Sequence, residues 1–371
     1  MKEGWGNKTL GEVCKIYNGN SINADYKKKH FLGANEGLPF IATKDVSPLG
    51  TIDYKNGVRI PNYEEYKVAP ANSVFICAEG GSAGKKFAYV EKDVCFGNKL
   101  FCITPKDKSI TGKFVYHFVQ SDNFRGQFFS LLTGLIGGVS AKKFQTIEIP
   151  VPPLSEQQSI VDYLDSAFAK IDAMKANAEK ALNEAKALFQ ASLKEMLEPK
   201  EGWEEKTIGD ILNLRRGHDL THSQMSGSNY PVAGSNGQIG THNSCTPISP
   251  CITVGRSGSV GAVNIYKECW AHNTTLYIDD FKGNYPQYLY YLLKSIDLLH
   301  LNSGSAVPTL NRNFIHPIIV PYIKDIVAQQ TIVATLDALK SKVDRLKANY
   351  EKISKECDAL KQALLKEVFE G

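Results

Sequence analysis

The sequence has no long hydrophobic run and no segment typical of a secreted chain. Its 371 residues contain no stretch of about 18 or more apolar residues, and no charged segment followed by an apolar one stands at the start. We therefore expect neither a membrane-spanning helix nor a secretion signal. The eight cysteines are scattered and form no CxxC pair, which is typical of reduced thiols in the cytoplasm. We expect a cytoplasmic protein with no membrane partner.

A large excess of charge of one sign is missing too. The chain carries 43 Lys and Arg against 39 Asp and Glu, a formal net charge of +4. This balance permits a nucleic-acid partner but does not indicate one, because the binding domains of dedicated DNA-binding proteins are often more basic. The length suits two domains plus a further element. Composition alone leaves the function open.

The motifs of several enzyme classes are also missing. The Pro152-Pro153 pair lacks the flanking residues of an amino-methyltransferase motif, and the nearest approach to a P-loop, at Gly84-Lys85, lacks its first glycine and its final Ser or Thr. His218 and His222 have the spacing of a zinc-protease helix, but Asp219 stands where the glutamate belongs. We predict no catalytic residue and no metal site on this chain.

The sequence does contain an internal repeat. Residues 4–19 and 202–217 are identical at six positions, where chance would give roughly one. The similarity continues in order, because the glycine turn at 81–84 returns at 258–261, Phe144 aligns with Phe314, and the Gln-Gln pair at 157–158 returns at 329–330. Each copy is long enough to form a domain, which excludes a solenoid of small repeats.

Each copy changes character along its length. Short β-like runs broken by Gly, Pro and Asn come first. A short helix is expected next, over 113–121 and 286–294, and then an apolar strand that closes on proline. A long helix follows in each copy. In the first copy, Ser155 and Gln158 predict a capping box at its start.

Apolar or small residues recur at steps of three and four along both long helices, which is the pattern of a coiled coil. We predict an antiparallel pair within the chain; pairing between two chains is the alternative. The predicted class is α+β, with two β-rich domains in tandem, each followed by a long helix, over 1–153, 154–198, 199–321 and 322–371. The predicted seam residues are Leu164, Phe168, Ile171, Met174, Ala178, Ala181, Ala185 and Leu188, then Ile332, Leu336, Leu339, Val343, Leu346, Tyr350, Ile353, Cys357, Leu360 and Leu364.

This order of elements resembles the specificity subunit of type I restriction–modification systems. The resemblance is carried by the stretch 5–11 with its echo at 203–209, by Pro39-Phe40-Ile41 before Asp45, and above all by the stretch 147–158. It covers the whole chain. The second copy departs from the pattern at 320–322, where the double proline and the serine cap are missing, and this leaves the start of the second helix open.

The resemblance implies that each globular domain is a target-recognition domain for one half of a bipartite, asymmetric site in double-stranded DNA. It implies that the helices set the spacing and dock two methyltransferase subunits, and that motor–nuclease restriction subunits join them. The chain would be non-catalytic, within a complex that is a site-specific deoxyribonuclease and adenine methyltransferase. S-adenosylmethionine, ATP and Mg would belong to the partner subunits.

Candidate DNA contacts are the basic and amide side chains near glycine turns and strand ends, because recognition needs cations for phosphates and donors for base edges. The alternative is that these charges are solvated surface and the turns purely structural. The predicted residues are Lys27, Lys28, Lys29, Lys44, Lys85, Lys86, Lys142 and Lys143 in the first domain, and Arg215, Arg216, Arg256, Asn311 and Arg312 in the second.

Two other functional classes stay open at this point. One is a coiled-coil scaffold that binds only protein partners. The other is the reading arm of another class of restriction or methylation system. The target sequence and its spacer length do not follow from the residues, because recognition depends on loop geometry and DNA shape as well as on residue type.

Overall fold

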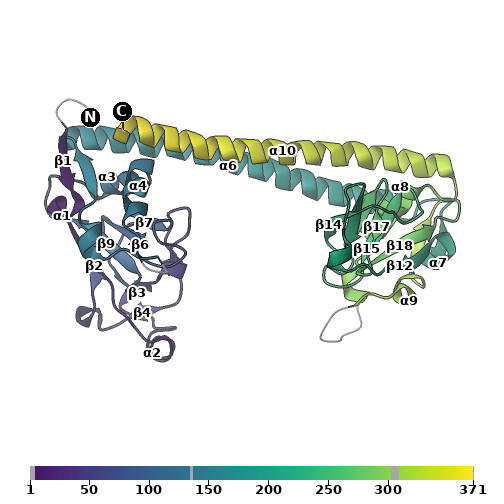
Figure 1. Cartoon of the computed structure of the whole chain (residues 1–371), viewed down its shortest axis with the longest axis horizontal. Helices are drawn as coiled ribbons and strands as arrows, with labels where there is room; N and C mark the ends of the chain where they lie inside the picture. The colour runs from purple at the N-terminus through teal and green to yellow at the C-terminus, as the bar shows by residue number, and fades with distance from the viewer. Residues whose placement is uncertain (1–4, 134–136, 302–308, 371) are drawn as a thin grey trace. The chain divides into compact units, whose positions relative to one another are not determined.

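A computed structural model describes residues 5–133, 137–301 and 309–370 of the chain. The chain divides into two compact units, unit 1 with residues 1–177 and 351–371, and unit 2 with residues 178–350 (Figure 1). Each unit contains one β-rich domain and one part of each of two long helices, α6 (Leu154–Met196) and α10 (Ile326–Glu370). This order confirms the predicted α+β class with two β-rich domains, each followed by a long helix.

The domain of unit 1 contains two four-stranded sheets, ordered β2-β9-β6-β7 and β4-β3-β8-β5, and the separate antiparallel pair β1-β10. Its strands are β1 (Gly6–Thr9), β2 (Cys14–Asn18), β3 (Leu38–Ile41), β4 (Arg59–Ile60), β5 (Val68–Ala69), β6 (Ser73–Cys77), β7 (Phe87–Val90), β8 (Val94–Phe96), β9 (Leu100–Pro105) and β10 (Glu148–Val151). Its helices are α1 (Leu10–Val13), α2 (Ala24–His30), α3 (Gly112–Phe118), α4 (Asp122–Ser130) and α5 (Ala141–Phe144), with short 3-10 turns η1 (Thr43–Asp45) and η2 (Tyr63–Glu65).

The domain of unit 2 has the corresponding sheet order β12-β18-β15-β16, a three-stranded sheet β14-β13-β17, and the pair β11-β19. Its strands are β11 (Glu204–Thr207), β12 (Asn213–Arg216), β13 (Tyr230–Gly234), β14 (Gly237–His242), β15 (Cys251–Gly255), β16 (Val263–Tyr266), β17 (Trp270–Ala271), β18 (Thr275–Asp280) and β19 (Ile319–Tyr322). Its helices are α7 (Ile208–Ile211), α8 (Pro286–Ser295) and α9 (Arg312–Ile315), with 3-10 turns η3 (His222–Gln224) and η4 (Leu299–Leu301).

The sequence repeat is also a repeat of hydrogen bonds. Thr9 caps α1, and the Glu12 carboxylate accepts from the backbone N–H of Thr9, which completes a capping box. Thr207 and Asp210 form the same capping box at α7. The repeated glycine two residues after each threonine lets the chain cross a backbone segment closely. A Cβ added at Gly11 would lie 2.9 Å from the Cβ of Gln145. The repeated stretch at the start of each copy therefore encodes one local structure, which occurs twice.

One alignment within the repeat was wrong by a residue. The short helices α5 and α9 begin after the caps Ser140 and Asn311. Phe144 therefore corresponds to Ile315, and both side chains are fully buried. Phe314, which the sequence paired with Phe144, is 48% exposed. A shared aromatic residue suggested the match, whereas the distance from the helix cap decides which residue enters the core.

The first long helix starts differently from the prediction. Ser155 lies inside the first turn of α6, where the backbone N–H of Gln157 donates to the carbonyl of Pro153 at 2.9 Å. Gln158 bonds Asp162 instead of closing a capping box. In α10 the carboxylate of Asp325 accepts from the N–H of Val327 at 2.9 Å. The open question at the start of the second helix is thus answered by an aspartate cap.

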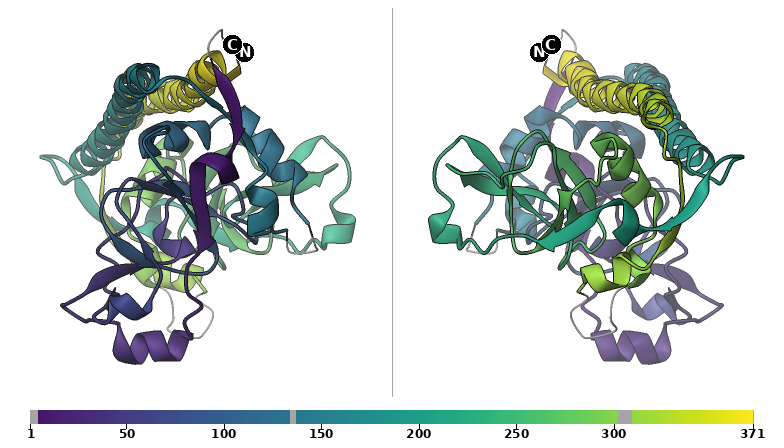
Figure 2. Two further views of the ribbon diagram at one scale, coloured as in Figure 1. Left: turned by 90° about the vertical axis from the view of Figure 1, so that its left-hand side faces the viewer. Right: turned by 90° about the vertical axis from the view of Figure 1, so that its right-hand side faces the viewer.

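Within unit 1 the two long helices run antiparallel. Lys361 pairs with Asp172 at 2.6 Å, and Lys175 pairs with Asp358 at 3.2 Å, so residue numbers that increase along α6 face decreasing numbers on α10. In Figure 1 and Figure 2 the C-terminal part of α10 lies beside α6. The last turn of α10 packs into the domain core, where the Phe369 ring lies 5.3 Å from that of Phe114. In this unit the predicted antiparallel pairing inside one chain is confirmed.

The predicted seam of α6 needs a correction. Met174 and Leu188 are 59% and 60% exposed, and Ala181 is exposed too. Leu182 and Phe189 are buried instead, so the seam keeps strict heptad steps of four and three beyond Ile171. On α10, Leu360 was also predicted to lie in the seam, but it is 48% exposed. The error began at Met174, which is apolar and was therefore assigned to the seam. Its neighbour Lys175 occupies the seam position instead, and its ammonium pairs with Asp358.

None of the helices in the described ranges is long and apolar enough to cross a membrane.

Candidate nucleic-acid interface

The five predicted residues of the second domain surround one cavity of about 310 Å³. They come from three separate segments. Arg215 and Arg216 end strand β12, Arg256 follows β15, and Asn311 and Arg312 start α9. Within unit 2, α9 lies on the side away from α10 (Figure 1). Folding therefore concentrates four guanidinium groups at the ends of neighbouring strands, with Leu276 as the apolar wall.

Three of these arginines already have acceptors. Arg216 pairs with Asp219 at 2.9 Å, and Arg215 lies 3.9 Å from Asp279. The Asn273 amide, together with Arg216, holds the pKa of the Asp219 carboxyl below its usual range, so that carboxylate stays ionised. Arg312 donates to the carbonyl of Leu214 at 3.3 Å. Each partner orients its guanidinium group but uses only some of the N–H donors, so the others stay available.

A histidine that sequence reasoning missed supports this cavity. The Nε2 atom of His316 accepts from the backbone N–H of Leu214 at 3.1 Å, which requires that nitrogen to be unprotonated. Burial and the nearby cations Arg312 and Lys282 lower the pKa of His316. The neutral ring therefore fixes the residue before Arg215 without adding charge. The only sequence signal was its place directly after α9.

The predicted lysines of the first domain come from four separate segments, α2, η1, the glycine turn at 81–84 with the two residues after it, and α5. Lys86 donates to the carbonyl of Thr43 at 3.0 Å, which joins the glycine turn to the loop that carries exposed Lys44. Exposed Lys85 lies in the same turn as Lys86, whereas Lys142 and Lys143 are exposed on α5. The structure thus brings together the loops of Lys44, Lys85 and Lys86.

The lysines Lys27, Lys28 and Lys29 occupy the last turn of α2. Within unit 1 this helix lies at the end of the domain remote from α6 (Figure 1). Lys27 stacks over the Phe40 ring at 5.1 Å, and the other two are exposed. Cations at a helix C-terminus also interact favourably with the helix dipole, so this cluster has a local structural role as well.

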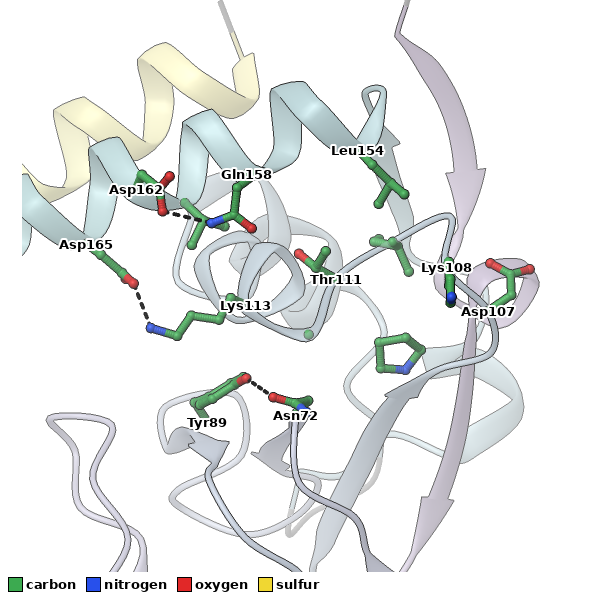
Figure 3. Close-up of a pocket in the computed structure, with 14 residues that line it drawn as sticks. Asn72, Tyr89, Asp107, Lys108, Thr111, Lys113, Leu154, Gln158, Asp162 and Asp165 are labelled. Carbon is green, nitrogen blue, oxygen red and sulfur yellow. Dashed lines mark hydrogen bonds and ion pairs between the residues drawn. The ribbon is translucent and has the colours of Figure 1, made fainter.

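Unit 1 has a different cavity, of about 590 Å³, where α6 begins (Figure 3). Asp165 accepts from Lys113 at 2.6 Å and from the Nε2 of buried His117 at 2.8 Å. The His117 bond is the main cause that lowers the pKa of Asp165 to about 2. Asp107 and Asp162 also line the cavity. Two lysines, Lys108 and Lys113, line it as well. The three carboxylates outnumber them, so this cavity favours phosphate less than the arginine-lined cavity of unit 2 does.

The histidine pair that has zinc-protease spacing does not converge on a metal centre. His218 contacts the Trp270 and Tyr277 rings, with centroids 5.2 and 5.6 Å apart, and His222 begins the turn η3. Over residues 5–133, 137–301 and 309–370, no group of three or more His, Cys, Asp or Glu side chains could hold a metal ion.

The comparison with protein families gives two matches in tandem. The model of the family described as type I restriction modification DNA specificity domain matches residues 2–184 and 200–355. The two matched segments correspond to the two copies of the internal repeat, each with its domain and most of the helix that follows.

Curated relatives carry related descriptions. The specificity subunit of the type I restriction enzyme EcoKI, from Escherichia coli, is 29% identical over 203 residues, which are 52% of this chain and 42% of that subunit. The StySPI specificity subunit from Salmonella potsdam is 27% identical over 205 residues, with the same two shares. Each match thus spans less than half the length of the relative.

Two solved structures share the fold over nearly the whole chain. One, described as showing complex assembly and conformational transition of the type I R-M system, has a TM-score of 0.77 at 18% identity and covers 99% of this chain and 97% of its own. The HsdS subunit from Thermoanaerobacter tengcongensis has a TM-score of 0.56 at 19% identity, covering 100% and 98%. At these identities the likeness concerns the fold alone.

Proposed function

Because the chain belongs to the family of type I restriction modification DNA specificity domains, we propose that it gives a type I restriction–modification complex its DNA sequence specificity. Each β-rich domain binds one half of a bipartite, asymmetric site in double-stranded DNA. The observation that carries this proposal is the pair of family matches, one for each copy of the repeat, whose candidate contact loops differ in sequence. A shared scaffold with divergent loops suits two unlike half-sites.

The cavity of unit 2 supports a DNA partner on chemical grounds. Four arginines line it with one leucine and one asparagine. Guanidinium groups bind phosphate and the edge of guanine in bidentate fashion, and asparagine can bind adenine in the same way. A surface that bound only protein partners would be expected to carry aromatic or apolar residues at its centre.

The long helices have a second role in this proposal. They set the spacing between the half-sites and dock two methyltransferase subunits, and motor–nuclease subunits complete the restricting complex. The chain itself is non-catalytic. Adenine methylation and DNA cleavage belong to the partners, which bind S-adenosylmethionine, ATP and Mg. The relatives' descriptions as specificity subunits of type I restriction enzymes support this division of labour.

The test is to produce the chain with its methyltransferase in cells that lack other adenine methylation, and to map methylated adenines across the genome. We expect one bipartite motif with a fixed gap, present only when the chain is produced. Purified chain and methyltransferase should also shift a duplex that carries the motif. Methylation that is unchanged without the chain, or that follows an uninterrupted motif, would contradict the proposal.

A further inference from the structure

Arg256 is held by its backbone on both sides. Its N–H donates to the carbonyl of Thr274 at 2.8 Å, and its own carbonyl accepts from the N–H of Leu310 at 2.8 Å. The first bond ties it to the segment before β18 and the second to the segment before α9. The Cα position of Arg256, and the direction in which its side chain leaves the backbone, are therefore fixed before any ligand binds.

Unit 1 contains the same backbone arrangement around Ala78. The N–H of Ala78 donates to Lys99 at 2.9 Å, and its carbonyl accepts from the N–H of Val139 at 3.1 Å. Ala78 follows Cys77 at the end of β6, as Arg256 follows the last residue of β15. The two residues are thus structural equivalents. Ala78 is buried, so the same scaffold position presents a long cation in the second domain and no polar group in the first.

Arg256 also differs from the other arginines of its cavity. Arg215 and Arg216 each face a carboxylate, and Arg312 bonds a carbonyl. In the ranges that the structure describes, no carboxylate lies within ion-pair distance of Arg256. In the same ranges no side-chain hydrogen bond holds its guanidinium either, so its fork of donors is available to a ligand. A bidentate contact needs two free parallel N–H groups on one guanidinium.

We propose that Arg256 is the specificity-determining residue of the second domain and binds the major-groove edge of a guanine. This inference rests on the proposed function. Guanine presents two adjacent acceptors on that edge, and arginine matches them with two donors. Because the backbone of Arg256 is already fixed, forming the pair costs only the rotamer freedom of the side chain. Arg215, Arg216 and Arg312 supply the surrounding positive charge and contact phosphates.

The test compares Arg256→Lys with Arg215→Lys in the full chain bound to its methyltransferase. Binding is measured to duplexes that carry the mapped motif and every single-base change in its second half. Lysine keeps the charge but loses the bidentate fork. We expect Arg256→Lys to lose about 5- to 150-fold in discrimination at one G·C pair of the second half-site. Arg215→Lys should leave discrimination unchanged at every position.

Several results would overturn the assignment. A second half-site without a G·C pair contradicts it directly. So does an Arg256→Lys variant with wild-type discrimination, or an Arg256→Ala variant that weakens binding equally on all sequences while the salt slope falls by about one, which is the signature of a phosphate contact. A changed unfolding midpoint in Arg256→Lys would assign the residue a structural role instead. Failure of the proposed function is distinct, because the wild-type complex would then have no motif to test.

Discussion

The repeated glutamine at the start of each long helix is predicted to join that helix to its domain. Gln157 is fully buried. Its side-chain oxygen accepts from the N–H of Thr111 at 3.0 Å, and its Nε2 donates to the carbonyls of Ser109 at 2.8 Å and Pro152 at 2.9 Å. One amide therefore satisfies three backbone groups of the domain. It fixes the first turn of α6 to the start of α3.

Replacing Gln157 by leucine keeps the approximate volume and leaves those three backbone groups without a partner. A buried donor or acceptor that loses its partner costs about 1–3 kcal/mol. Water can reach some of the groups once the amide is gone, so we expect a loss of about 2–4 kcal/mol in the free energy of unfolding. The second copy should respond alike, because Gln329 is also fully buried and bonds Tyr285, Ile323 and Asn284.

The neighbouring glutamine provides the matched control. Gln158 is exposed on the next position of the same helix and bonds only Asp162 within it, so Gln158→Leu should change stability by less than about 0.5 kcal/mol. Urea unfolding of the full chain, followed by circular dichroism and by tryptophan fluorescence, gives both values. Equal effects of Gln157→Leu and Gln158→Leu would refute the reasoning. So would a Gln157→Leu variant as stable as the wild type.

Two further predictions concern the helices. The pKa of Asp165 is lowered to about 2, so its stabilising contribution is present above about pH 4 and is lost as the pH falls toward 2. Asp165→Asn should therefore destabilise unit 1 at pH 7 by an amount that shrinks in acid. A difference in unfolding free energy that stays constant with pH would contradict this. Deleting residues 171–177 together with the facing residues 353–359 shortens each helix by about 10 Å. Binding measured on duplexes whose half-sites lie at varied gaps should then favour a gap about three base pairs shorter. An unchanged optimal gap with full affinity would show that the helices do not set the distance.

Much of the architecture is predictable from the sequence because the residues that form each local structure occur twice, once in each copy of the repeat. The Thr-Leu-Gly and Thr-Ile-Gly stretches encode the same capped turn, and Gln157 and Gln329 encode the same joint. Agreement between two divergent copies separates structural residues from variable ones. The helix α4 has no α-helical counterpart among the described residues of unit 2, 178–301 and 309–350, and it was missed, which fits this view.

The errors came from residues whose environment depends on register. Met174 looks like a seam residue by type, but the heptad period places Lys175 at the seam, where its charge finds Asp358. Phe314 matches Phe144 by type, but the distance from the cap Asn311 leaves it exposed. Residue type alone does not distinguish adjacent helix positions, since neighbours differ by about 100° around the axis.

The candidate site was predictable in one unit only. In unit 2 the arginines lie beside glycine turns at strand ends, and sheet topology brings such ends together. In unit 1 the lysines of α2 and α5 lie on separate elements, and no spacing in the sequence indicates which of them share a surface. The sequence repeat also does not reveal that Arg256 and Ala78 are equivalent. Matching the glycine turns 81–84 and 258–261 pairs Arg256 with the residue after Ala78, whereas the backbone hydrogen bonds pair it with Ala78 itself.

The most direct test of the central claim, that the two domains recognise separate half-sites, is an exchange of one domain. Residues 199–321 are replaced by the corresponding domain of a related specificity subunit with a known target, and methylated adenines are mapped across the genome with the same methyltransferase. We predict that the second half of the motif changes to that of the donor, while the first half and the gap stay as they were. A motif that changes in both halves, or that keeps its original second half, would contradict the account.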